Sequence, residues 1–166
     1  MTIYTDASFE NGELRLGWVC FGSSQPFGGT CVVPDEVIHT WKARDQQIFP
    51  GECLAALVLP IVCPDFFRDQ DCIWFVDNQA AVASLIKGTS SEPDVHEIVH
   101  MAALLRDALR ARVWFEWIDS DSNTSDGLSR EGLCCQWSRA QDWSLEEVPF
   151  PQQASRDAIR NLLLAL

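Results

Sequence analysis

The 166-residue chain has the length of one ordinary domain, and 47% hydrophobic and 22% charged residues exclude an intrinsically disordered protein. Twelve basic and 24 acidic residues give a formal net charge of −12. This charge argues against a stand-alone nucleic-acid-binding protein, because such proteins use basic surfaces to neutralise phosphates.

The number of cysteines and the distribution of apolar residues indicate the cellular compartment in which the protein works. The seven cysteines are an odd number and include no C-x-x-C pair, which favours a reducing compartment over a disulfide or zinc scaffold. No apolar run approaches the ~18 residues that a membrane span needs. Residues 1–6 have neither the basic region nor the apolar core of a signal peptide. We therefore expect an intracellular protein, in cytoplasm or nucleus, that is not secreted and has no membrane partner.

The first forty residues show strand-like alternation interrupted by turn-forming residues. Asn11-Gly12 is a typical hairpin turn, and Pro34 interrupts the last apolar stretch. Short connections between consecutive strands predict an antiparallel meander. The expected elements are strands over 2–9, 14–21, 30–33 and 36–41, with a loop over 22–29.

The apolar period becomes helical after Pro50-Gly51. A later continuous apolar run, 72–76, predicts a strand buried on both faces. The resulting order of strands and helices predicts an α/β fold, in which helices pack on a mixed sheet. The expected elements are a helix over 53–61 limited by Pro60 and Pro64, the strand 72–76, a short helix stopped by Gly88, a longer helix from Pro93, a strand over 113–118, and a helix from Asp126 capped by Asn123 or Thr124.

The last residues differ from the rest of the chain. We divide the sequence into a domain over 1–148 and a C-terminal tail over 149–166, which opens with Pro149 and Pro151. The end of the tail predicts an amphipathic helix that packs on this domain or on a neighbouring one. Its apolar face consists of Ala158, Ile159, Leu162, Leu163 and Leu166.

Four carboxylates fall at informative places on four separate elements. Asp6 lies inside the first strand, Asp77 follows the strand 72–76, and Glu52 and Asp126 lie in the first turns of helices. Acids at helix N-termini and strand ends also have ordinary structural roles, whereas an acid in mid-strand is harder to explain that way. If the first strand lies beside 72–76, Asp6 and Asp77 come close together, and the other two can approach from flanking helices.

Carboxylates gathered in one place repel each other unless cations bind among them. A set of oxygen ligands without an organised histidine favours a hard ion, Mg²⁺ or Mn²⁺. Two such ions about 4 Å apart can activate a water molecule and stabilise the leaving oxygen of a phosphodiester.

Four sequence blocks that contain these acids resemble the successive motifs of the ribonuclease H family, type 1. The last block is most similar to the N-x-A-D-x-L-S-R ending found in ribonuclease H domains of reverse-transcribing elements, with Ser125 in place of the alanine. The resemblance covers about residues 2–131, in the order of the family. The blocks are Tyr4-Thr5-Asp6-Ala7-Ser8, Gly51-Glu52-Cys53-Leu54-Ala55-Ala56, Trp74-Phe75-Val76-Asp77-Asn78-Gln79-Ala80-Ala81 and Asp121-Ser122-Asn123-Thr124-Ser125-Asp126-Gly127-Leu128-Ser129-Arg130.

The resemblance implies a mixed five-stranded sheet with helices on both faces. It implies an endoribonuclease that cuts the RNA strand of RNA–DNA hybrids with two Mg²⁺ ions, which Mn²⁺ can replace. Asp6 would bridge both ions, Glu52 and Asp77 would serve the leaving-group side, and Asp126 the water side. Gln79, next to Asn78, matches a family position that contacts the hybrid in its minor groove, where the RNA 2′-hydroxyl is displayed.

The sequence departs from the family pattern in two places. Many members carry a histidine in the loop before the last aspartate, but 119–125 contains none, and 87–93 lacks the basic protrusion with which some members hold the hybrid. We therefore expect weak substrate binding by the isolated domain, and reliance on a covalently linked reverse transcriptase domain. Trp41, Lys42 and Arg44 are candidates for a stacking and phosphate-binding edge.

Alternative interpretations remain open. A catalytically silent ribonuclease H-like module would serve as a spacer or interaction domain, although such copies generally lose a carboxylate. A nuclease of the same fold that cuts DNA would keep the fold and the metals. A calcium loop starting at Asp119 fails, because Thr124 and Arg130 stand where glycine and glutamate are needed. The tryptophans in the predicted strands are expected in the core or in packing on the sheet: Trp18, Trp74, Trp114 and Trp117.

Overall fold

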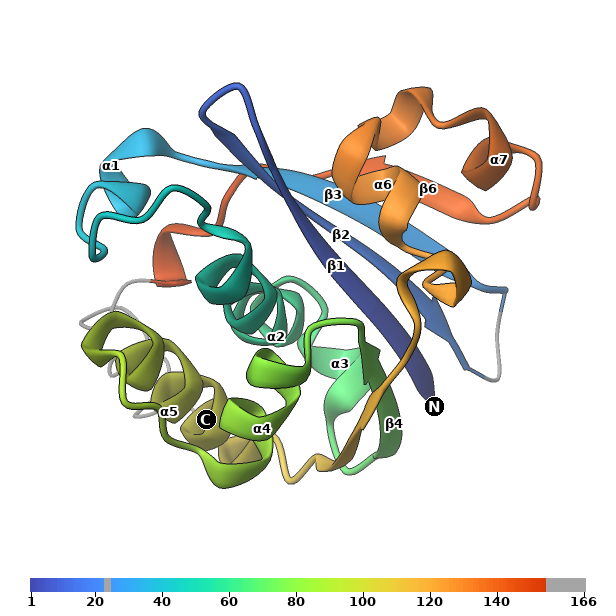
Figure 1. The fold of residues 1–166 in the computed structure, drawn as a ribbon. Helices are drawn as coiled ribbons and strands as arrows, with labels where there is room; N and C mark the ends of the chain where they lie inside the picture. The colour runs from blue at the N-terminus through green and yellow to red at the C-terminus, as the bar shows by residue number, and fades with distance from the viewer. Residues whose placement is uncertain (23–24, 155–166) are drawn as a thin grey trace.

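A six-stranded mixed sheet in the order β5-β4-β1-β2-β3-β6 forms the centre of the protein (Figure 1). The computed structural model describes residues 1–22 and 25–154. β1, β2 and β3 form the predicted antiparallel meander, whereas β4 runs parallel to β1, β5 parallel to β4, and β6 parallel to β3. The strands are β1 (Thr2–Glu10), β2 (Glu13–Phe21), β3 (Phe27–Val33), β4 (Asp71–Val76), β5 (Arg112–Trp117) and β6 (Ser144–Glu147).

Helices connect and cover these strands. The expected helical segments after Pro50, before Gly88 and from Pro93 are all present, and Gly88 ends its helix with a left-handed φ of 65°. Pro60 lies inside a helix and does not end it. The helices are α1 (Asp35–Ile38), α2 (Ile48–Val62), α3 (Pro64–Phe67), α4 (Gln79–Lys87), α5 (Pro93–Ala108), α6 (Asp126–Arg130) and α7 (Gln136–Arg139), with short 3₁₀ turns η1 (Ser120–Ser122), η2 (Gly132–Cys134) and η3 (Gln152–Ala154).

Helices lie on both faces of the sheet, as expected. Gly51 of α2 lies against the side chains of Ala7 and Leu14, so α2 covers the face of the sheet to which these two side chains point. Gly17 of β2 lies so close to α6 that a methyl group there would overlap the backbone of that helix. Gly17 pairs with Asp6, the neighbour of Ala7, and successive side chains of a strand point to opposite faces. α2 and α6 therefore cover opposite faces. In Figure 1, α4 and α5 lie with α2, whereas α6 and α7 lie near β3 and β6.

The prediction of five strands was wrong by one strand. β6 has the sequence Ser-Leu-Glu-Glu and its residues are mostly exposed. It lies at the edge of the sheet, where backbone hydrogen bonds to β3 hold it without a buried side-chain face. A strand of this kind has no apolar alternation that a sequence pattern could detect.

Two local predictions in the first forty residues were also wrong. The β-like stretch 36–41 contains the short helix α1, which begins after Pro34 and leads into turns. β3 starts at Phe27 rather than at residue 30, because Gly28 and Gly29 pair with β2. The ring of Trp18 lies where a side chain of Gly29 would be, so the glycine allows close packing inside the strand.

The expected burial of β4 and β5 holds for one face only. Trp18 and Trp74 are buried in the core as predicted, but Ile73 is 47% exposed and Trp114 is 68% exposed. Trp117 is 43% exposed at the end of β5. These residues lie on β4 and on the edge strand β5, where α4 and α5 cover one face and the described helices leave the other more open.

The beginning of the predicted tail packs on the domain. Phe150 and Ala154 contact the hydrophobic core, and the Val148 amide donates to the Thr30 carbonyl oxygen, 3.0 Å away. The amphipathic helix expected over 158–166 lies outside the described residues. Among the described helices, none has the length and apolar character needed to cross a membrane.

Candidate metal centre

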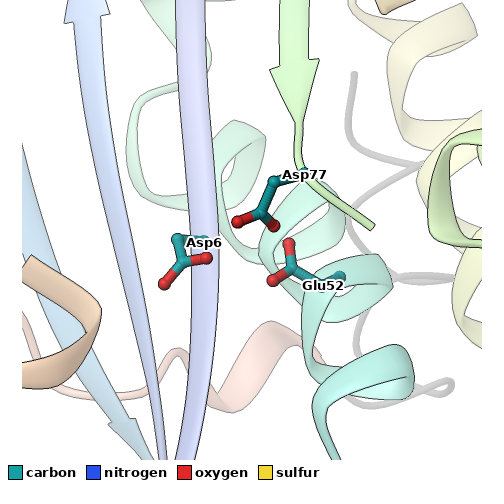
Figure 2. Close-up of side chains that lie close together, drawn as sticks. All are labelled: Asp6, Glu52 and Asp77. Atoms are coloured by element: carbon teal, nitrogen blue, oxygen red, sulfur yellow. The ribbon is translucent and has the colours of Figure 1, made fainter. Parts of the chain in front are cut away.

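Three of the four predicted carboxylates gather where β4 ends beside the middle of β1 (Figure 2). One oxygen each of Asp6, Glu52 and Asp77 lies within 4.8 Å of the other two. Parallel pairing of β1 with β4 ends at Thr5 and Val76, so the next residue of each strand, Asp6 and Asp77, lies at the same place. The fold thus brings these acids together from β1, α2 and the end of β4.

Glu52 enters the site because β1 continues beyond the end of β4. Past Thr5 the backbone of β1 has no β4 partner, and the Ala7 amide donates to Glu52 Oε1, 2.9 Å away. The second oxygen, Oε2, is buried with no hydrogen-bond partner. Glu52 is only 1% exposed. One carboxylate oxygen is therefore anchored to the strand, and the other is left for a ligand.

Asp6 is held from the other side of the sheet by Ser129 of α6. The buried Ser129 hydroxyl donates to Asp6 Oδ2 and also lies 2.8 Å from the Asp126 carbonyl oxygen. Ser8 attaches the same helix to β1, since its hydroxyl donates to the Ser129 carbonyl oxygen at 2.6 Å. Sequence reasoning did not assign a role to Ser129, although it belongs to the L-S-R part of the last block.

Asp126, the fourth predicted ligand, is not one of the three clustered acids. Its carboxylate accepts a hydrogen bond from Arg130 Nε at 2.7 Å, and its side chain is 36% exposed. Asn123 does not cap α6; its amide group donates to the Thr5 carbonyl oxygen at 3.0 Å and anchors the preceding loop to β1. The N-cap of α6 is Ser125, which makes no side-chain capping bond.

Burial and mutual repulsion shift the acids of the cluster toward their neutral forms. Burial raises the pKa of Asp6 from 3.8 to about 6, with smaller upward contributions from Asp77 and Asp126 and an opposing one from the Ser129 hydrogen bond. The pKa of Glu52 lies well above its usual range, first because of burial and then because of Asp6 and Asp77. Without a counter-charge, the site is electrostatically unfavourable when ionised.

The donor set fits a hard divalent cation. All three clustered groups are carboxylates, and the buried Glu52 Oε2 lacks a partner that a cation would supply. A cation would also neutralise the repulsion that raises the pKa of Asp6 and of Glu52. The arrangement supports the predicted class of metal site.

The predicted substrate-contacting residues at α4 lie beside this cluster. Asn78 forms the N-cap of α4, and its Oδ1 accepts a hydrogen bond from the Ala81 amide at 3.0 Å. Gln79 follows as the first residue of the helix and is exposed. Gln79 is therefore accessible to a ligand near Asp77, whereas the Asn78 oxygen already has a structural partner.

The predicted phosphate-binding edge is occupied by acids from the start of α5. Lys42 Nζ lies 2.8 Å from Glu92 Oε2, and Arg44 makes two hydrogen bonds to the carboxylate of Asp94, at 2.6 and 2.8 Å. Trp41 is half-buried against the hydrophobic core. Sequence patterns could not reveal these pairs, because about 50 residues separate each cation from its acid.

Ser129→Ala is expected to weaken divalent-metal binding. The hydroxyl lowers the pKa of Asp6, so its removal favours the protonated side chain that binds metal poorly. Losing a hydrogen bond that orients a ligand typically costs about 10–100-fold in metal affinity. Calorimetric titration with Mg²⁺ or Mn²⁺ measures this loss.

Ser8→Ala is the matched control for Ser129→Ala. Ser8 is also buried and also attaches α6 to β1, but it bonds to the Ser129 carbonyl oxygen rather than to Asp6. We expect Ser8→Ala to reduce stability with little change in metal affinity. Equal losses of affinity in both variants would mean that Ser129 acts only through the packing of α6.

No known family model and no curated protein sequence matches the chain. Solved structures that share its fold include two ribonucleases H. Ribonuclease H1 from the halophilic archaeon Halobacterium salinarum is 19% identical with a TM-score of 0.60, covering 80% of this chain and 96% of its own. The N-terminal ribonuclease H domain of Rv2228c from Mycobacterium tuberculosis, solved as a fusion with maltose-binding protein, is 17% identical with a TM-score of 0.58, covering 84% and 96%. At these identities the likeness establishes the fold: the protein has a ribonuclease H-like fold.

Proposed function

We propose that the protein is a metal-dependent endoribonuclease that cuts the RNA strand of RNA–DNA hybrids. The observation that carries this proposal is the cluster of Asp6, Glu52 and Asp77 at the point where β4 ends beside β1. The cluster lies on a ribonuclease H-like fold, and its members belong to sequence blocks that resemble that family. Both structural relatives bear the ribonuclease H name.

Asp6, Glu52 and Asp77 would hold Mg²⁺, or Mn²⁺ in its place, and Asp126 at the margin of the site would complete the set for a second ion. Bound metal supplies a nucleophilic water and stabilises negative charge on the phosphate. The protein itself fixes the ligands: the Ala7 amide orients Glu52, and Ser129 orients Asp6. This positioning keeps the charged oxygens directed at one place.

Gln79 is the residue we propose for hybrid recognition. It is exposed on the first turn of α4, two residues after Asp77, so its amide can reach a duplex bound at the carboxylates. A side-chain amide can both donate to and accept from a 2′-hydroxyl or a base edge in the minor groove. Its role would be to bind substrate rather than to take part in hydrolysis.

Gln79→Ala is expected to raise the KM for an RNA–DNA hybrid while leaving metal affinity unchanged. Loss of one hydrogen bond to an uncharged group corresponds to roughly a three- to tenfold change in KM. Steady-state cleavage kinetics measure this change, with Gln141→Ala, the same change at an exposed residue outside α4, as the matched control. An unchanged KM would mean that Gln79 only begins α4 and does not contact the substrate.

The charge distribution supports the proposal that this domain needs a partner to bind hybrids tightly. Lys42 and Arg44 are paired with Glu92 and Asp94, and Arg130 contacts Asp126, so these cations are partly neutralised. The net charge of −12 adds long-range repulsion of phosphates. A basic partner, such as a linked reverse transcriptase domain of a retroelement, would supply the missing affinity.

Cleavage of matched, end-labelled RNA–DNA, RNA–RNA and DNA–DNA duplexes tests the proposed activity. We expect Mg²⁺-dependent cuts in the RNA strand of the hybrid, which a chelator abolishes. Asp77→Asn should remove activity, whereas Asp121→Asn, the same change at an exposed acid of the loop, should not. Cleavage of the DNA duplex alone would indicate a DNA nuclease of the same fold. Absence of cleavage in all three duplexes would indicate a silent module.

A further inference from the structure

β5 forms an open edge of the sheet, because no described strand lies beyond it. It pairs with β4 on one side only. The Arg112 amide donates toward β4, to the Gln70 carbonyl oxygen. Because successive amides of a strand point in opposite directions, those of Val113 and Phe115 point to the open side. The backbone of β5 therefore offers hydrogen bonds to a further strand.

Exposed apolar side chains lie beside this edge. Trp114 is 68% exposed, and its neighbour across the strands, Ile73 of β4, is 47% exposed. Both lie on the face of the sheet that α4 and α5 do not cover. An edge strand with exposed apolar side chains is a place where another strand can add. We propose that β5 pairs antiparallel with β5 of a second copy of the protein, about a two-fold axis at Trp114.

The side chains of β5 specify this register. Alternate residues of a strand share one face, so its exposed row reads Arg112, Trp114, Glu116. Antiparallel pairing about Trp114 places Arg112 of each copy opposite Glu116 of the other, with the two Trp114 rings facing each other. Opposite charges and aromatic rings at directly opposed positions stabilise paired strands. The two-fold axis makes the charge pair occur twice.

The backbone directions agree with the same register. In antiparallel strands, opposed residues alternate between pairs that exchange two hydrogen bonds and pairs that exchange none. The register opposes Val113 to Phe115 of the second copy, and both residues direct their amides to the open side. These residues can therefore exchange hydrogen bonds. Trp114 and the charged residues fall in the other kind of pair, in which side chains lie closer together.

Charged side chains often protect an edge strand from pairing. Such protection is strongest where identical strands bring like charges together, whereas this register joins unlike charges. Arg112 Nε lies 2.5 Å from Asp71 Oδ1, but a guanidinium has further donors for a second carboxylate.

The net charge of −12 on each copy opposes association at long range. At about 0.15 M salt this repulsion is largely screened beyond about 8 Å. A strand of six residues forms a small interface, which is typical of weak and reversible dimers. The proposal does not depend on the proposed nuclease activity.

Sedimentation of the whole protein over a range of concentrations tests the proposal, and we expect a reversible monomer–dimer equilibrium. Arg112→Glu and Glu116→Arg each place like charges opposite each other twice, so each should raise the Kd of the dimer by about tenfold or more. An equimolar mixture of these two variants should associate again, because one copy then carries acids and the other carries cations at both positions. Glu36→Arg, the same change at an exposed acid of α1, should not weaken the dimer.

Trp114→Thr is a second variant that should keep the fold, because the side chain is mostly exposed and threonine suits a strand. Loss of the aromatic pair should also raise the Kd by about tenfold or more. Trp137→Thr, the same change at a 52% exposed residue of α7, is its matched control.

Three results would overturn pairing through β5. Only monomer at concentrations up to about 1 mM would show that the edge does not self-associate. A dimer that none of the β5 variants weakens would place the interface elsewhere. A mixture of Arg112→Glu and Glu116→Arg that associates no better than either variant alone would show that these two residues do not face each other.

Discussion

Asp6→Asn is expected to abolish cleavage of RNA–DNA hybrids while preserving the fold. Asparagine has the shape of aspartate, and its carbonyl oxygen can accept the hydrogen bond from Ser129. It lacks the negative charge that a divalent cation requires at the centre of the cluster. Because removing a group that only orients a ligand costs about 10–100-fold in metal affinity, loss of a ligand should exceed 100-fold in activity.

The same substitution should leave the metal-free protein at least as stable as the wild type at neutral pH. Asp6 is 4% exposed and lies beside Glu52 and Asp77, so its removal relieves repulsion in a buried place. Thermal unfolding in a chelator measures this effect, and Asp45→Asn makes the same change at an exposed position. Near-normal cleavage by Asp6→Asn would show that Asp6 is not a metal ligand.

The centre of the site could be predicted from the sequence because strand geometry alone determines it. Asp6 interrupts the pattern of its strand, and Asp77 directly follows an apolar run that predicts a second strand. Parallel pairing of the two strands then places Asp6 and Asp77 next to each other. Glu52 was expected there only as an acid of a flanking helix whose block resembles a family motif, and the same reasoning applied to Asp126, which is not one of the clustered acids.

The supporting contacts could not be predicted, because they join residues that are far apart in the sequence. Ser129 reaches Asp6 across 123 positions, and Arg44 reaches Asp94 across 50. Neither pair produces a local periodicity. The same reason explains the missed strand β6, which depends on backbone pairing with β3. The 68% exposure of Trp114 could not be predicted either, because strand propensity does not tell which face of an edge strand is covered.

The stability of the metal-free protein is expected to fall as the pH rises from about 4 to 7. The pKa of Asp6 is about 6 in the folded protein and 3.8 ordinarily, so the folded state binds more protons in this range. The stability that protonation contributes is complete below pH 3.8 and is lost as the pH passes 6. This displacement of the pKa corresponds to roughly 3 kcal/mol, and Glu52 acts in the same direction.

Binding of a divalent cation should restore the stability that is lost as the pH rises, because the cation neutralises the carboxylates in place of protons. We expect Mg²⁺ to raise the Tm by several degrees at pH 7.5 and by much less at pH 5, where protons compete for Asp6 and Glu52. Thermal unfolding at both pH values, with Mg²⁺ and with a chelator, measures the difference. The Asp6→Asn/Glu52→Gln variant should show neither the pH-dependent loss nor the Mg²⁺ effect. Asp94, whose pKa the Arg44 hydrogen bond lowers to about 2, is ionised in the folded protein at both pH values. An Mg²⁺ effect of equal size at both pH values would place metal binding on acids outside the cluster.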